Sequence, residues 1–167
     1  MLILISGLPG SGKTTLAKAY AARYGALHLN SDLLRRELGL MGQYRPEDKK
    51  KVYDTLLERT REALLEGREV VVDSTFYKEI IREPFRRLAA ECAARLRWVE
   101  VRAQEPAIRE RLKTPRADSE ADFAVFEKIR NEYEPLEEPH LILWSDEKPL
   151  EQMAASMRQY VNAHQLS

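Results

Sequence analysis

A glycine-rich loop near the start of the chain constrains the fold more than any other stretch. The pattern G-x-x-x-x-G-K-[ST] is met at every fixed position by Gly7-Leu8-Pro9-Gly10-Ser11-Gly12-Lys13-Thr14. A backbone that wraps a triphosphate aims several N–H groups inward, and glycine permits the dihedrals and the close approach that this requires. The pattern therefore predicts that Lys13 reaches the β- and γ-phosphates and that Thr14 places its hydroxyl on Mg²⁺.

The residues on either side of this loop have the composition that the pattern needs. The apolar run Leu2-Ile3-Leu4-Ile5 suits a buried parallel strand, and residues 15–23 are strong helix formers. The N-terminus of a helix that starts near Lys13 points its partial positive charge at the same phosphates. We therefore predict a nucleotide-binding loop made of Gly10, Ser11, Gly12, Lys13, Thr14 and Thr15.

The rest of the chain alternates between strand and helix patterns. Further strands are predicted at 26–30, 69–73, 97–101 and 140–144, and the main helices at 46–66, 77–96, 119–133 and 150–164. Pro84 either kinks its helix or starts a second one. This alternation predicts an α/β protein of the P-loop NTPase fold, one domain over 1–167, with a five-stranded parallel sheet covered by helices on both faces. Ligands of such a sheet bind at the carboxyl ends of its strands.

Composition limits the possible partners and the compartment. Lys plus Arg equals Asp plus Glu at 27 each, so no overall field attracts nucleic acid or a membrane, and a polynucleotide substrate would need a local basic patch. The apolar start is too short for a signal peptide or a membrane span, so we expect a cytoplasmic protein with no membrane contact. The spacing of His28, His140 and His164 suggests no metal site, so we expect no chemistry from them.

Two residues after the second predicted strand are candidates for acceptor chemistry. Asp32 follows that strand and can accept a proton from an incoming hydroxyl, although it could instead cap the helix that follows, as could Ser31. Arg35 is one helical turn further on, where its guanidinium can hold a phosphate or carboxylate of the acceptor. The alternative for Arg35 is an internal ion pair with Asp32 that stabilises the helix slightly.

Charged residues also follow the third and fourth predicted strands. Asp73 ends a β-branched run, as a Walker-B acid does, and either holds Mg²⁺ through water or only forms a turn. The stretch from about 104 to 122 contains Arg109, Arg111 and Arg116 and few apolar residues. It suits a lid that closes over the nucleotide and offers positive charge to the transition state, although any basic surface helix has a similar composition.

Together these residues resemble the P-loop kinases of the nucleoside-monophosphate-kinase type. Within that group the chain is similar to the AAA-type predicted kinases around the polynucleotide 5′-hydroxyl kinases and the zeta-toxin-like enzymes. The matching stretches are GLPGSGKTT at 7–15, D-x-x-R at 32–35, VVVDST at 70–75 and the arginine-rich lid. The resemblance implies that Lys13 and Thr14 hold phosphates and Mg²⁺, that Asp32 is the general base and that Arg35 holds an acceptor phosphate. It also implies that a lid arginine, for which we choose Arg116, contacts the donor phosphates.

The sequence thus predicts a phosphotransferase that uses ATP and Mg²⁺ and moves the γ-phosphate to a hydroxyl. A polynucleotide 5′-hydroxyl is the leading acceptor, and a small molecule such as a nucleoside, sugar or antibiotic is the alternative. A non-catalytic nucleotide-binding module is a third reading. A GTPase switch is disfavoured because the chain has no N-K-x-D motif. The sequence does not indicate an oligomeric state.

Overall fold

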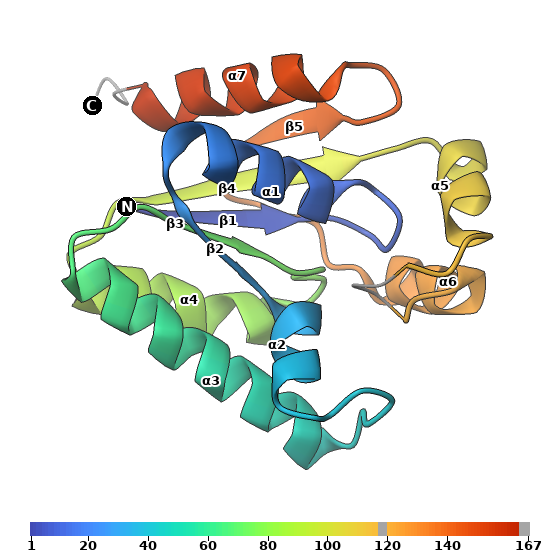
Figure 1. The fold of residues 1–167 in the computed structure, drawn as a ribbon, viewed down its shortest axis with the longest axis horizontal. Helices are drawn as coiled ribbons and strands as arrows, with labels where there is room; N and C mark the ends of the chain where they lie inside the picture. The colour runs from blue at the N-terminus through green and yellow to red at the C-terminus, as the bar shows by residue number, and fades with distance from the viewer. Residues whose placement is uncertain (117–119, 164–167) are drawn as a thin grey trace.

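The computed structural model describes residues 1–116 and 120–163. Strands and helices alternate along the chain, and α5 and α6 lie between β4 and β5 (Figure 1). In chain order the elements are β1 (Leu2–Ser6), α1 (Lys13–Tyr24), β2 (Leu27–Asn30), α2 (Ser31–Glu37), α3 (Pro46–Leu65), β3 (Val70–Asp73), α4 (Glu79–Glu91), β4 (Leu96–Arg102), α5 (Glu105–Leu112), α6 (Phe123–Glu132), β5 (His140–Trp144) and α7 (Leu150–Asn162).

The strands form one five-stranded parallel sheet in the order β2-β3-β1-β4-β5. The predicted sheet is therefore confirmed. Strand β1 is central and fully buried, because it pairs with β3 on one side and β4 on the other. All the strands end at the same edge, which brings the phosphate loop, Asn30 and Asp73 together there. In this order β3 separates β2 from β1, so the end of β2 lies about 10 Å from the start of the phosphate loop.

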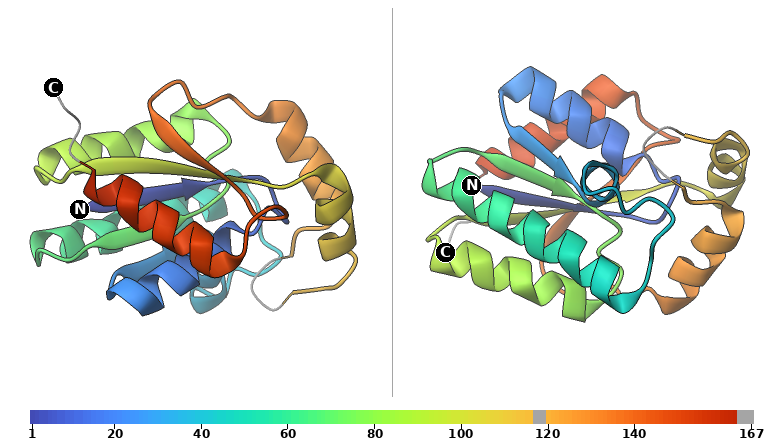
Figure 2. Two further views of the ribbon diagram at one scale, coloured as in Figure 1. Left: turned by 90° about the horizontal axis from the view of Figure 1, so that it is seen from above. Right: turned by 60° about the horizontal axis from the view of Figure 1, so that its bottom comes forward.

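Helices cover both faces of the sheet, α1 and α7 on one and α3 and α4 on the other (Figures 1 and 2). Successive strand residues point to opposite faces, so Leu2 and Leu4 pack toward α3 and α4, whereas Ile3 and Ile5 pack toward α1 and α7. Each face therefore has its own apolar core. Together the two cores fix the strand ends that position the site.

Helices α5 and α6 stand apart from these two layers, beyond the carboxyl ends of the strands (Figure 1). Their own small apolar cluster is built on Ile108, Leu112 and Phe126. Leu8 of the phosphate loop packs against this cluster. The predicted lid segment is therefore attached to the phosphate loop by apolar contact as well as by polar groups.

The main differences from the sequence expectations lie at α4 and α6. Pro84 does not start a second helix, since α4 continues through it. Helix α4 ends at Glu91, earlier than expected, and Ala93 then adopts a left-handed φ of 49°. Helix α6 begins at Phe123 with Asp122 as its cap, where the Asp122 side chain accepts a hydrogen bond from Val125 N. Ser119, the first residue of the predicted helix at 119–133, lies outside the described residues.

Candidate nucleotide and acceptor site

The phosphate loop connects β1 to α1, and its glycines are required for two different reasons. Gly10 and Gly12 have φ values of 78° and 98°, in the left-handed region that side chains disfavour. At Gly7 the reason is close approach, because a Cβ there would lie 2.6 Å from the Val101 carbonyl oxygen and 2.6 Å from Ser11 Oγ. The loop is thus packed tightly against β4. Lys13 and Thr14 follow it as the first two residues of α1.

One arginine of the predicted lid contacts this loop directly. Arg111 Nη1 donates hydrogen bonds to the Gly10 carbonyl at 3.0 Å and to Ser145 Oγ at 2.8 Å. Ser145 follows β5, and its hydroxyl donates to the Ser11 carbonyl at 2.5 Å. A guanidinium from α5 and a hydroxyl from the β5–α7 connection therefore border the phosphate loop. No sequence pattern pointed to Ser145.

The other two lid arginines lie elsewhere. Arg109 pairs with Glu105 at 2.9 Å, and its guanidinium carbon lies 3.8 Å from the centre of the Phe123 ring. It therefore ties α5 to the start of α6. Arg116 is exposed. Among these three arginines, the structure places Arg111 at the phosphate loop.

Asp73 lies beside Thr14 at the end of β3 and is fully buried. Its Oδ1 accepts hydrogen bonds from Thr14 Oγ1 at 2.7 Å and from Asn30 Nδ2 at 2.7 Å. Its Oδ2 accepts a hydrogen bond from His28 Nε2. Asp73 thus does more than form a turn, because three donors from β2 and α1 converge on its carboxylate.

The donor set at this point fits Mg²⁺. This ion prefers oxygen ligands and usually binds through few carboxylates together with phosphates and water. Thr14 and Asp73 supply a hydroxyl and a carboxylate within one hydrogen bond of each other. No cluster of three or more His, Cys, Asp or Glu side chains that could hold a metal is present in the described part of the chain. Phosphate oxygens would therefore have to complete such a site.

Asp32 lies in the first turn of α2, and it is not the cap of that helix. Asn30 takes the cap position, and its Oδ1 accepts a hydrogen bond from Leu33 N at 2.8 Å. Ser31 is engaged elsewhere, since its hydroxyl lies 3.0 Å from that of Ser74. The capping alternatives for Asp32 and Ser31 are therefore wrong. Asp32 itself is half-buried.

Arg35 lies under the loop that follows α2. Its side chain is only 5% exposed, and its Nη1 donates to the Gln43 carbonyl at 2.7 Å. The Tyr44 ring covers the guanidinium at 4.4 Å from ring centre to carbon, a cation–π geometry. Arg35 Nε is buried without a hydrogen-bond partner among the described residues. An arginine in this state can accept a further polar or anionic partner.

Glu120 holds the same loop from the side of the lid. Its Oε2 accepts hydrogen bonds from Gly42 N at 2.9 Å and from Tyr44 Oη at 2.5 Å. Burial and the hydrogen bond to Glu120 raise the pKa of Tyr44 to about 12, so its hydroxyl remains a donor at neutral pH. Segments 78 residues apart in the sequence are thereby joined above Arg35.

Tyr53 of α3 completes this side of the site, and no sequence pattern pointed to it. Its hydroxyl lies 2.8 Å from that of Ser74, which follows Asp73. Burial is the main cause that raises the pKa of Tyr53, and the nearby charge of Asp32 raises it further. The charge of Asp32 also raises the pKa of Tyr44. Asp32 therefore shares one region with two tyrosine hydroxyls that stay protonated.

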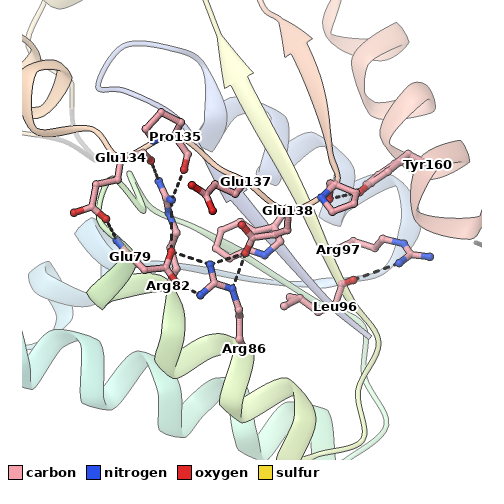
Figure 3. Close-up of a pocket in the computed structure, with 12 residues that line it drawn as sticks. Glu79, Arg82, Arg86, Leu96, Arg97, Glu134, Pro135, Glu137, Glu138 and Tyr160 are labelled. Carbon is pink, nitrogen blue, oxygen red and sulfur yellow. Dashed lines mark hydrogen bonds and ion pairs between the residues drawn. The ribbon is translucent and has the colours of Figure 1, made fainter.

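Two cavities lie near the carboxyl half of the chain, and they differ in their relation to the phosphate loop. The first measures about 360 Å³, and Leu8 and Ser11 of the loop help to line it, together with Ile108, Tyr133 and Trp144. The second measures about 880 Å³ and lies between α4, the start of β4 and the segment before β5 (Figure 3). No residue of the phosphate loop lines the larger one.

Two of the three arginines that line the larger cavity, Arg82 and Arg86, already have hydrogen-bond or ion-pair partners. Arg82 is 1% exposed and donates to the carbonyls of Phe76 at 2.6 Å and Pro135 at 3.1 Å, and also to that of Glu134. Arg86 pairs with Glu138 at 2.6 Å (Figure 3). These bonds tie the chain after β3 to the chain before β5, so we assign these two arginines a structural role.

The phosphate loop, the Asp73 carboxylate beside Thr14 and the parallel sheet define the protein as a P-loop nucleotide-binding protein. The profile of the family described as AAA domain (AAA_33) matches residues 2–136, and the chain therefore belongs to this P-loop kinase family. In the described residues, no helix is long and apolar enough to span a bilayer.

Proteins similar in sequence cover only part of this chain. The uncharacterized protein Rv2004c of Mycobacterium tuberculosis is 34% identical over an alignment of 102 residues that covers 54% of this chain and 20% of that protein. A cytidylate kinase of Caldicellulosiruptor bescii is 30% identical over 105 residues, 60% of this chain and 46% of that enzyme. The chain therefore corresponds to less than half the length of these two curated relatives.

Solved structures match over nearly the whole chain. The Mycobacterium tuberculosis APS kinase CysC, in complex with AMPPNP and APS, has a TM-score of 0.74 at 17% identity, with 97% of each chain covered. A gluconokinase from Sinorhizobium meliloti has a TM-score of 0.69 at 20% identity, again with 97% of each covered. Chaetomium thermophilum Kti12, in complex with ADP-AlF3, has a TM-score of 0.65 at 20% identity, covering 98% of this chain and all of that one. At these identities the likeness supports the fold alone.

Proposed function

We propose that this chain is an ATP-dependent kinase that transfers the γ-phosphate to a hydroxyl group, and that residues 1–167 form one kinase domain with a lid over about 104–122. The observation that carries the proposal is the position of Asp32. This half-buried residue is not the cap of α2 and follows β2, whose end lies two strand spacings, about 10 Å, from the start of the phosphate loop. We propose that a phosphate and an acceptor hydroxyl bind between the two.

The proposed roles follow from the chemistry of phosphoryl transfer, which depends on positioning and on neutralising charge. The phosphate loop and Lys13 bind the donor phosphates, and Arg111 adds positive charge from the lid. Thr14 and Asp73 would hold Mg²⁺, which when bound neutralises charge on the transferred group. Asp32 orients the acceptor hydroxyl and accepts its proton.

A small acceptor suits the surroundings of Asp32 better than a polynucleotide does. Arg35 is covered by Tyr44, and the covering loop is held by Glu120, so the arginine of the D-x-x-R stretch is enclosed. A nucleic-acid strand needs an open basic surface, and the chain has no net charge to attract one. Among the similar proteins described above, those whose names state an acceptor are a cytidylate kinase, a gluconokinase and an APS kinase. We therefore favour a small hydroxyl compound.

A polynucleotide 5′-hydroxyl remains the second candidate because D-x-x-R at 32–35 is present and Arg35 Nε has an unused hydrogen-bonding position. The two acceptors differ in their response to salt. Binding of a strand that neutralises several phosphates weakens steeply with rising salt, whereas a small acceptor with one charge contact responds weakly.

The test is release of ADP from Mg-ATP in the presence of separate acceptors: nucleosides, sugars, aminoglycosides and 5′-hydroxyl oligonucleotides of DNA and RNA. We expect one small compound to raise ADP release well above the acceptor-free rate and to carry the phosphate. Phosphate found on an oligonucleotide, with a steep salt dependence, would instead support the polynucleotide reading. ATP binding without stimulation by any acceptor class would support a non-catalytic nucleotide-binding module.

A further inference from the structure

The carboxylate of Asp73 is held by side chains from β2 as well as by Thr14. His28 and Asn30 are two residues apart on that strand, so both side chains point to the same face. Asn30 is directly opposite Asp73 in the β2–β3 register, and His28 is opposite Val71. The pairing of β2 with β3 therefore brings an imidazole and an amide to one buried carboxylate.

The two donors act on different oxygens. Asn30 Nδ2 donates to Oδ1 at 2.7 Å, and His28 Nε2 contacts Oδ2. An ionised carboxylate only accepts hydrogen bonds, so His28 carries its ring hydrogen on Nε2 and donates it. Rotation of the carboxylate about its own axis would break one bond or the other. Thr14 shares Oδ1 with Asn30, so His28 is the donor that fixes the second oxygen.

We propose that His28 is a positioning residue that holds Asp73 in the orientation required for binding a Mg-nucleotide. This inference rests on the proposed function insofar as Thr14 and Asp73 serve Mg²⁺. The Thr14 hydroxyl can offer an oxygen lone pair to the ion and still donate its hydrogen to Oδ1. Thr14 and Asn30 would then hold Oδ1, and His28 would hold Oδ2. Groups that hydrogen-bond to metal ligands commonly change metal affinity 10- to 100-fold when they are removed.

The position of His28 agrees with such a role. Its side chain is 12% exposed and comes from a strand, which is a more rigid support than a loop. His140 offers a matched control, because it also comes from a strand, is 14% exposed and lies 3.3 Å from a buried carboxylate, that of Glu100. Glu100 belongs to β4 and is not among the groups that contact Thr14 or Asp73 in the described structure.

The test is a Mg²⁺ titration of the binding of a fluorescent ATP analogue, compared with binding in EDTA. For His28→Leu we expect the Mg²⁺ concentration at half-maximal binding to rise about tenfold or more, with binding in EDTA unchanged. His28→Gln retains a donor at a similar reach and should change this concentration less than about threefold, as should His140→Leu. If His28→Leu matches the parent, or if His140→Leu shows the same rise, the inference is wrong.

A second measurement uses the unmodified protein and so does not depend on whether a variant folds. Nitrogen-15 NMR of the histidine rings should show the hydrogen of His28 on Nε2, and a ring with its hydrogen on Nδ1 alone would overturn the inference. The binding assay needs no acceptor, so it separates this inference from the kinase proposal. If the parent binds Mg-nucleotide and His28→Leu needs no more Mg²⁺ than the parent, only the inference is refuted. Absence of Lys13-dependent Mg-nucleotide binding in the parent would refute both.

Discussion

Replacing Gly7 with alanine tests whether the phosphate loop is set by close packing against β4. The added Cβ would lie 2.6 Å from the Val101 carbonyl oxygen, and ordinary contact begins near 3.4 Å, so one of the two has to move by about 0.8 Å. The Ser11 hydroxyl, also at 2.6 Å, can rotate away, but the Val101 carbonyl belongs to a paired strand of the buried sheet. We therefore expect the phosphate loop to move.

Inserting a carbon atom into well-packed structure costs about 1–3 kcal/mol. If the loop moves and the strand does not, this free energy is lost from nucleotide binding. About 1.4 kcal/mol corresponds to a tenfold weaker affinity. Gly25→Ala is the control, because Gly25 has a positive φ of 74°, which Gly7 does not, and a Cβ there would meet nothing within 4 Å. That variant should lose about 1–2 kcal/mol of unfolding free energy from backbone strain.

The assays are urea unfolding and calorimetric titration with an ATP analogue. Gly7→Ala should weaken nucleotide binding at least about tenfold, whereas Gly25→Ala should lose stability with nucleotide affinity unchanged. Normal nucleotide affinity in a folded Gly7→Ala protein would refute the packing argument. Equal weakening in both variants would refute it as well.

Three further changes test separate contacts of the site and the core. Arg111→Ala removes two charge-assisted hydrogen bonds and should weaken nucleotide binding about tenfold in titration calorimetry. A larger loss in Arg116→Ala would assign the donor contact to Arg116 instead. Glu120→Ala frees the loop above Arg35 and should raise the acceptor KM about fivefold with the ATP KM unchanged. Equal rises of both KM values in steady-state kinetics would contradict this. Burial raises the pKa of Tyr20 to about 12 from 10.0, so its contribution to stability is complete below pH 10 and lost as the pH rises through about 12. The urea midpoint of Tyr20→Phe should fall less over this pH range than that of the parent. An equal fall in the two proteins would refute the assignment.

The sheet and the phosphate loop could be predicted because their signals are local. A run of four apolar residues, a glycine pattern and helix formers follow one another within the first 23 residues, so neighbouring positions suffice. Asp73 could be proposed for the same reason, since the β-branched strand precedes it directly. Thr14 and Asp73 then meet because β1 and β3 are neighbours in the sheet.

The remaining parts of the site depend on contacts between distant segments. His28 and Asp73 are 45 residues apart, Tyr44 and Glu120 are 76 apart, and Ser11 and Ser145 are 134 apart. No pattern in the sequence marks the Tyr44–Glu120 and Ser11–Ser145 pairs. For His28 a usable signal existed, since it alternates with Asn30 on a strand that pairs with β3. A signal also existed for the cap of α2, because asparagine is a common capping residue. Asn30 takes that position instead of Ser31 or Asp32, and its side chain accepts a hydrogen bond from Leu33 N.

The most direct test of the central claim compares the parent with Asp32→Asn in two assays, transfer of labelled γ-phosphate from Mg-ATP to the acceptor found in the screen and binding of an ATP analogue. Loss of a positioned general base costs about 100-fold or more in rate, and the change leaves the phosphate loop intact. We predict that transfer falls at least about 100-fold while nucleotide affinity stays within about twofold. Transfer at the parental rate would contradict the assignment of Asp32 as the base, and with it the account of this edge of the sheet as a hydroxyl kinase site.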